Sequence, residues 1–209
     1  MVGVRFNDKH SFYDYGLILS SKTIEAPSVK VKNVDVTGAD GVIDYTDFFG
    51  EPKFSNRKLT FVFSKCQTNS QFVDEFSTIQ NELNGQKMNI RIDTDPDFYY
   101  TGRISLKASR SNNITKLTVT CDCQPYKLKN KKTVVEAKRS TTVSLFNLRK
   151  RTVPTITTTA ETTIIFGTRK TVLSAGQWVI PEFELMPGNN IFIIISKGTT
   201  TFEYQEGGL

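Results

Sequence analysis

Few side chains in this sequence have both the type and the spacing that catalysis requires. The chain has one histidine, His10, so it cannot supply the pairs of histidines typical of catalytic zinc sites. His10 stands close to Ser11 and Asp14, the residue types of a hydrolytic triad, but no nucleophile elbow surrounds a serine or Cys66. We keep a hydrolase as an alternative, and we predict that the chain is not an enzyme and has no catalytic residue.

Two further motifs resemble metal-binding sequences. Asp93-x-Asp-x-Asp97 is similar to the start of a calcium loop, but such a loop needs glycine at its sixth position and glutamate at its twelfth, where this chain has Phe98 and Ile104. An acidic turn between two strands is the better interpretation. Cys121 and Cys123 point to one side of a strand without further ligands nearby, so we expect buried structural cysteines. The sequence predicts no metal and no cofactor.

The positive charge of the chain is concentrated in one short segment. The net charge is +6, and residues 127–151 contain nine basic residues and one acidic residue. Such a segment can bind nucleic-acid phosphates, with an affinity that falls steeply as salt rises. It can also be a solvated connector and strand edge. We favour the connector, because no aromatic residues alternate with the charges closely enough to stack on bases.

The hydrophobic spacing predicts a mainly β protein with one helix. Leu59, Phe61 and Phe63 alternate with other residues, as in a strand that packs on a core. Residues 29–36 nearly alternate valine with polar residues, which predicts a half-buried strand. The helix is expected from about Ser70 to Asn84. Its apolar stripe consists of Phe72, Phe76, Ile79 and Leu83, with Asn69 or Ser70 at its start and Gly85 after its end.

Two domains are expected, 1–130 and 131–209. The second has turn signals at short intervals and many threonines, which is typical of a small β-sandwich. Residues 191–195 are almost continuously apolar, which predicts a central strand buried on both faces. Trp178 and Phe183 are expected in the core. No apolar run approaches the roughly 18 residues needed to span a bilayer, so no membrane insertion is expected.

The chain contains a series of short motifs, each of which has little specificity alone. In their order and spacing they resemble the motifs of the distal tail protein family of siphophages and related prophages. Before the helix they are Phe6-Asn7, His10-Ser11, Asp14-Tyr-Gly-Leu17, Gly38-x-Asp-Gly41, Asp44-Tyr-Thr-Asp47, Gly50 and Asn56-Arg57. From the end of the helix onward they are Leu83-Asn-Gly85, Asp95-Pro96, Tyr99-Tyr-x-Gly-Arg103, Cys123-x-Pro-Tyr126 and the ending Tyr204-Gln-Glu-Gly-Gly-Leu209. The resemblance is denser before residue 127 than after it.

This resemblance implies a structural component of the tail tip, or baseplate hub, of a phage or prophage. The first domain would be a split-barrel-like domain related to tail-tube subunits, and six copies would close into a ring. The second would be a small galectin-like or jelly-roll-like sandwich. The implied partners are other copies of the chain, the tail-tube protein, the tail-tip hub protein and the tape-measure protein, with DNA only as passing cargo. The implied location is the virion tail tip, after synthesis in the host bacterial cytoplasm.

A ring of this kind needs two different contact surfaces on each subunit. The segment 38–58 is our candidate for one of them, because it combines aromatic and acidic residues on a loop longer than a hairpin requires. Arginines elsewhere can pair with carboxylates across such a contact. The candidate interface residues are Asp44, Tyr45, Asp47, Phe48, Phe49, Arg57 and Arg103. The alternative is that these residues pack within one subunit and form a salt-bridged rim.

Two other functions stay open from the sequence. The C-terminal sandwich can be a module that binds cell-wall carbohydrate during adsorption, although the resemblance assigns it no sugar-binding residue. The chain can also be a tail-tube subunit, because tube and tip proteins share ancestry. Copy number in purified particles separates a tube subunit from a component of the tip ring, since tube subunits stack in many copies and a tip ring occurs once.

Overall fold

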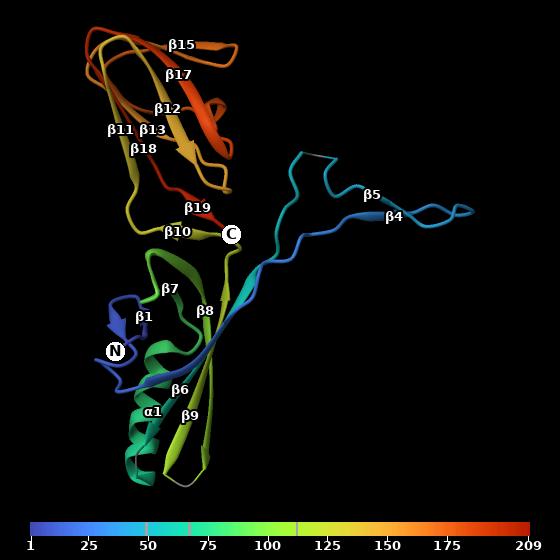
Figure 1. The fold of residues 1–209 in the computed structure, drawn as a ribbon, viewed down its shortest axis with the longest axis vertical. Helices are drawn as coiled ribbons and strands as arrows, with labels where there is room; N and C mark the ends of the chain where they lie inside the picture. Colours follow the sequence, from blue (N-terminus) through green and yellow to red (C-terminus); the bar gives the residue numbers. More distant parts are fainter. Residues whose placement is uncertain (49, 67, 112) are drawn as a thin grey trace. The chain divides into compact units, whose positions relative to one another are not determined.

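The computed structural model describes residues 1–48, 50–66, 68–111 and 113–209. The chain is mostly antiparallel β structure and splits into two compact units, Met1–Pro125 (unit 1) and Tyr126–Leu209 (unit 2). Figure 1 labels the strands of both units and the helix of unit 1. The predicted class, a mainly β fold with a helix in its first half, is confirmed.

Unit 1 contains an antiparallel sheet with strand order β2-β1-β7-β8-β9-β6-β3. Its strands are β1 (Val4–Phe6), β2 (Lys9–His10), β3 (Ile18–Ile24), β6 (Arg57–Cys66), β7 (Lys87–Ile92), β8 (Asp95–Ser111) and β9 (Ile114–Cys123). A separate two-stranded hairpin, β4 (Asn33–Asp35) with β5 (Val42–Asp44), lies between β3 and β6 in the chain. The sheet has two edge strands, β2 and β3, and β3 is the longer.

The core of unit 1 lies between the sheet and helix α1 (Asn69–Leu83). Leu59, Phe61 and Phe63 are completely buried, which confirms the predicted strand. The buried Cys121 and Cys123 confirm the prediction of structural cysteines. Burial raises the pKa of both thiols, to about 12 for Cys123, so both are uncharged at neutral pH.

Helix α1 lies where the apolar spacing predicts it, and its stripe packs against the sheet. Ile79 and Leu83 are buried, and Phe76 packs against the same core. The residue that caps the start is Thr68, one position before the predicted caps, and its backbone N–H donates to Gln71 Oε1 at 3.0 Å. Gly85 has φ +76°, so it follows the helix in the left-handed region, as predicted.

Unit 2 is a sandwich of two four-stranded sheets, with strand orders β11-β18-β13-β16 and β12-β17-β14-β15. The strands are β11 (Thr133–Lys138), β12 (Thr141–Asn147), β13 (Thr155–Thr158), β14 (Thr162–Phe166), β15 (Arg169–Leu173), β16 (Gly176–Val179), β17 (Gly188–Ser196) and β18 (Thr199–Tyr204). A short 3-10 turn, η1 (Pro181–Phe183), leads from β16 toward β17, and β10 (Lys127–Lys129) pairs with β19 (Gly207–Gly208). Leu145, Ile156, Ile164, Phe183, Phe192 and Phe202 belong to a single core cluster between the sheets.

Three predictions about burial are wrong. Residues 191–195 alternate between buried and exposed, and Ile191 is 60% exposed, because β17 is central in its sheet but only the inner face of that sheet is covered. Trp178 stands on an edge strand and is 37% exposed, whereas Phe183 is buried as predicted. The expected strand at 29–36 shrinks to Asn33–Asp35, and all of it is exposed, because among the described residues no third strand pairs with the hairpin.

Candidate functional site

An arm formed by residues 25–56 leaves the sheet of unit 1 between the end of β3 and the start of β6, and Figure 1 shows β4 and β5 at its outer part. Backbone hydrogen bonds join its two sides near the base, from Lys30 N to Lys53 O at 2.7 Å and from Ser55 N to Ser28 O at 2.8 Å. Gly38 and Gly41 have φ of +85° and +78°, so the predicted glycine turn joins β4 to β5.

The arm exposes most of its large apolar side chains. A two-stranded hairpin without further cover buries too little apolar surface to be stable by itself in water. Such a set of side chains is typical of a surface that packs against another molecule. The exposed apolar side chains of the arm are those of Val29, Val31, Val34, Val36, Val42, Ile43, Tyr45 and Phe48.

Four of the predicted interface residues lie together on the arm. Phe48 is 70% exposed, and its ring meets that of Tyr45 edge to face with centroids 5.6 Å apart. Asp44 and Asp47 directly precede Tyr45 and Phe48 in the sequence and add two carboxylates to this part of the arm. Hydrogen bonds from the side chain and backbone of Thr46 lower the pKa of Asp44, so its carboxylate is ionised at neutral pH. Phe49, which was predicted with them, is outside the described residues.

The two predicted arginines lie on other elements. Arg57 is only 7% exposed, donates to Glu25 O at 3.0 Å and to Pro125 O at 3.3 Å, and lies over the Tyr100 ring at 5.3 Å. Because Glu25 and Arg57 bracket the arm, this side chain fixes the arm's root inside unit 1. Arg103 is exposed on β8 and bonds to the Gly85 carbonyl after α1. The structure therefore does not bring the arginines to the aromatic residues of the arm.

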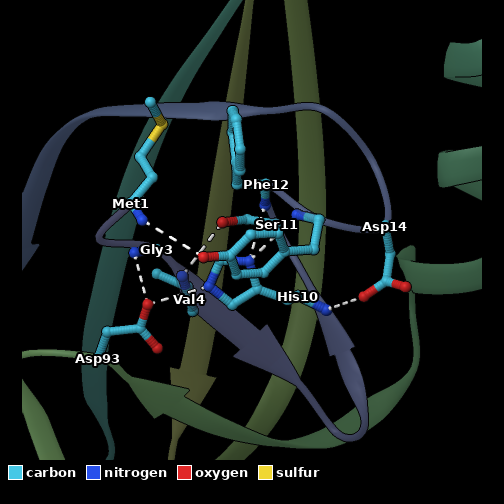
Figure 2. A network of polar contacts seen from close by, with 9 residues as sticks. Met1, Gly3, Val4, His10, Ser11, Phe12, Asp14 and Asp93 are labelled. Atoms are coloured by element: carbon cyan, nitrogen blue, oxygen red, sulfur yellow. Dashed lines mark hydrogen bonds and ion pairs between the residues drawn. The ribbon is translucent and has the colours of Figure 1, made fainter.

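His10, the candidate for chemistry in the sequence, is buried and has both ring nitrogens engaged (Figure 2). Nδ1 accepts the backbone N–H groups of Phe12 and Tyr13 at 3.1 and 3.2 Å. The ring proton of the neutral form is therefore on Nε2, which donates to Asp93 Oδ2 at 3.0 Å. The Oγ of Ser11 accepts the backbone N–H of Val4 at 3.1 Å, and both imidazole nitrogens have other partners among the described residues. This arrangement ties the N-terminal segment down and does not have the geometry of a hydrolytic triad.

The Asp93 carboxylate is the other centre of this network (Figure 2). Its Oδ2 also accepts the N–H of Gly3 at 2.8 Å. Burial raises the pKa of Asp93, but the hydrogen bonds from His10 and Gly3 outweigh burial and hold this pKa below its usual value. Gly3 has no room for a side chain, because a Cβ would lie 2.6 Å from the ring carbon Cε1 of His10.

The basic segment of unit 2 is partly neutralised by carboxylates of the same unit. Lys129 bonds to Glu206, which is only 2% exposed, and Lys132 bonds to Glu203. Arg151 lies 3.3 Å from Glu184. These pairs join residues distant in sequence, so part of the segment has a structural role that agrees with the connector interpretation.

Among the described residues, no group of three or more histidine, cysteine or acidic side chains lies close enough together to hold a metal ion. Within the same ranges, no helix has the length and apolar character to cross a membrane. No family model and no curated protein matches the sequence.

A comparison with solved structures shows that the chain has the fold of a phage distal tail protein. The matched protein is SPP1 Dit (gp 19.1), whose crystal structure is described as a paradigm of the hub adsorption apparatus in phages that infect Gram-positive bacteria. The TM-score is 0.73 and the match covers 100% of both chains at 17% sequence identity. At this identity the likeness shows the fold, and the resemblance inferred from the sequence motifs is confirmed at that level.

Proposed function

We propose that this protein is a structural component of the tail tip of a long-tailed phage or prophage. In this role six copies form a ring that joins the tail tube to the tail-tip adsorption protein and leaves a channel for DNA and the tape-measure protein. The observation that carries the proposal is the match to SPP1 Dit over the whole of both chains, which includes both units. The proposed location is the virion tail tip, and the protein has no enzymatic role there.

The arm supports the proposal that copies of the chain assemble with one another. Its apolar side chains have no cover within the described part of unit 1, and a neighbouring copy in a ring would supply it. We propose Asp44, Tyr45, Asp47 and Phe48 as contact residues of this surface. Arg57 supports the contact indirectly, by fixing the root of the arm. The exposed edge strand β3 offers a second route of contact, by strand pairing.

Light scattering of the purified full chain, alone and with the tube and tip proteins of its own particle, tests the assembly. We expect a defined oligomer, or a monomer that assembles only on those partners. Negative-stain images of particles labelled for this protein test its place, and we expect the label at the tail tip alone. A tail tip without label would overturn the proposal, and a label along the whole tail with a high copy number would indicate a tube subunit.

A further inference from the structure

Unit 2 has a groove on the side where both of its sheets end. β15 and β16 are edge strands, one in each sheet, and each has one backbone side without a partner strand in its sheet. A groove of about 610 Å³ lies along these strands and the start of η1. Its lining combines apolar side chains such as Leu173 and Ile180 with polar and charged ones. Grooves of this size with a few placed polar groups are typical of small-molecule sites.

Trp178 gives this groove an aromatic surface. Trp178 as a whole residue is 37% exposed, although a tryptophan without a ligand is usually more deeply covered. The ring Nε1 donates to Ser174 O at 3.0 Å, so the turn between β15 and β16 holds the ring in place. Gly176 also lies beside the indole, since a Cβ there would be 3.6 Å from Nε1, and its lack of a side chain leaves that side of the ring uncrowded. A fixed, partly open indole is suited to stacking on the C–H face of a sugar ring.

The charged side chains of the groove have no ionic partner in the part of the chain that the structure describes. Arg169, Lys170 and Glu182 line the groove, are exposed, and make no ion pair or side-chain hydrogen bond with any described residue. Other cations of unit 2, such as Lys129 and Lys132, do have carboxylate partners. The groove therefore offers two free cations against one free carboxylate, and its net charge favours an anionic ligand.

We propose that this groove binds an anionic saccharide. Trp178 stacks on a sugar ring, and Arg169 and Lys170 contact a carboxylate or phosphate group that the saccharide carries. Glu182 and the unpaired sides of the edge strands accept or donate hydrogen bonds to the hydroxyl groups. This binding does not depend on the proposed ring, because all the groups involved belong to one sandwich.

The protein contains its own reporter for this groove, because Trp178 is the single tryptophan of the chain. We would titrate the full-length protein with four probes while recording tryptophan fluorescence. The probes are a hyaluronan octasaccharide, which carries carboxylates, glucose 6-phosphate, chitohexaose, which is neutral, and inorganic phosphate. We expect a saturable change with one or both anionic sugars, at least about tenfold weaker binding of chitohexaose, and weaker binding at 300 mM than at 50 mM salt. The response to the two anionic sugars tells which anion is preferred.

Variants decide whether the groove itself is the site that binds the saccharide. Arg169→Gln combined with Lys170→Gln keeps the reporter and changes only exposed side chains, and we expect it to weaken binding about tenfold or more. Lys197→Gln, an exposed lysine of unit 2 outside the groove lining, is the matched control and should bind as the unchanged protein does. Trp178→Leu, followed by calorimetry, should also lose binding.

Four results would overturn the proposal. They are no saturable response to either anionic sugar, equal binding of chitohexaose, the same response to inorganic phosphate alone, and an equal loss in the Lys197→Gln control. None of them bears on the tail-tip role, which is tested by labelling and copy number.

Discussion

Replacement of Phe48 by serine is the most direct test of the arm as a contact between copies. Burying a phenylalanine side chain completely stabilises by about 2 kcal/mol, and Phe48 is still 70% exposed in the single chain. Complete burial of this side chain on docking of the arm would therefore stabilise each contact by about 1.5 kcal/mol. A closed ring of six has six such contacts, and the ratio of rings to free subunits depends on the fifth power of the free subunit concentration. The midpoint concentration for assembly should rise by about 20-fold.

The same substitution should leave the isolated chain nearly unchanged, within about 0.5 kcal/mol in its free energy of unfolding, because little of Phe48 is buried there. Mass photometry over a range of concentrations measures the assembly midpoint, and urea unfolding measures stability. Phe146→Ser is the matched control, since Phe146 is 53% exposed on the sandwich of unit 2. Equal shifts of the midpoint in both variants, or no shift for Phe48→Ser, would refute the assignment of the contact to the arm.

Three further predictions concern stability. Arg57→Met should lower the free energy of unfolding by about 2–3 kcal/mol in urea, because two carbonyls lose their charged donor; an unchanged value would remove Arg57 as the anchor of the arm's root. Gly102→Ala should cost about 3 kcal/mol or prevent folding, because its Cβ would lie 2.5 Å from Cys123 Sγ; full solubility and an unchanged Tm would contradict this close packing. The lowered pKa of Asp93 contributes stability that is present above its unfolded pKa, near 4, and is lost as pH falls through the folded pKa. Asp93→Asn keeps an acceptor for His10, so it should cost about 1 kcal/mol at pH 7 and flatten the loss of stability on acidification; an unchanged acid transition would argue against this role.

Local periodicity was sufficient to predict those helices and strands whose buried face is marked by the spacing of their own apolar residues. The helix stripe that ends at Leu83 and the alternation around Phe61 each specify one face, and both faces pack where they were expected. Gly38 and Gly41 were informative because positive φ is a local requirement that few other residues meet. Local signals of this kind do not depend on which distant strands or helices pack against the element.

The errors lie where burial depends on distant elements. The valines of residues 29–36 and the isoleucines of 191–195 have strand spacing, but periodicity does not show whether a second layer covers the strand. The exposed valines of the arm from Val29 to Val36, which lie before the candidate segment 38–58, were therefore missed as contact candidates. A glycine turn between two short apolar segments, without a third strand nearby in sequence, was the signal that could have found them. His10 and Asp93 are 83 residues apart, so no spacing rule predicts their bond.

The composition of the arm also bears on how the chain can expose so many apolar side chains without unwanted strand pairing. A free hairpin edge with valines is a template for unwanted strand pairing, and charges placed along the edge are a common protection against it. The outer part of the arm carries Asp35, Asp40, Asp44 and Asp47 without a basic residue between them. Two arms therefore repel each other, while a neutral or basic surface can still accept one. In the proposed ring, the acidic residues would select the partner surface, and the apolar residues would supply the binding energy once that surface is reached.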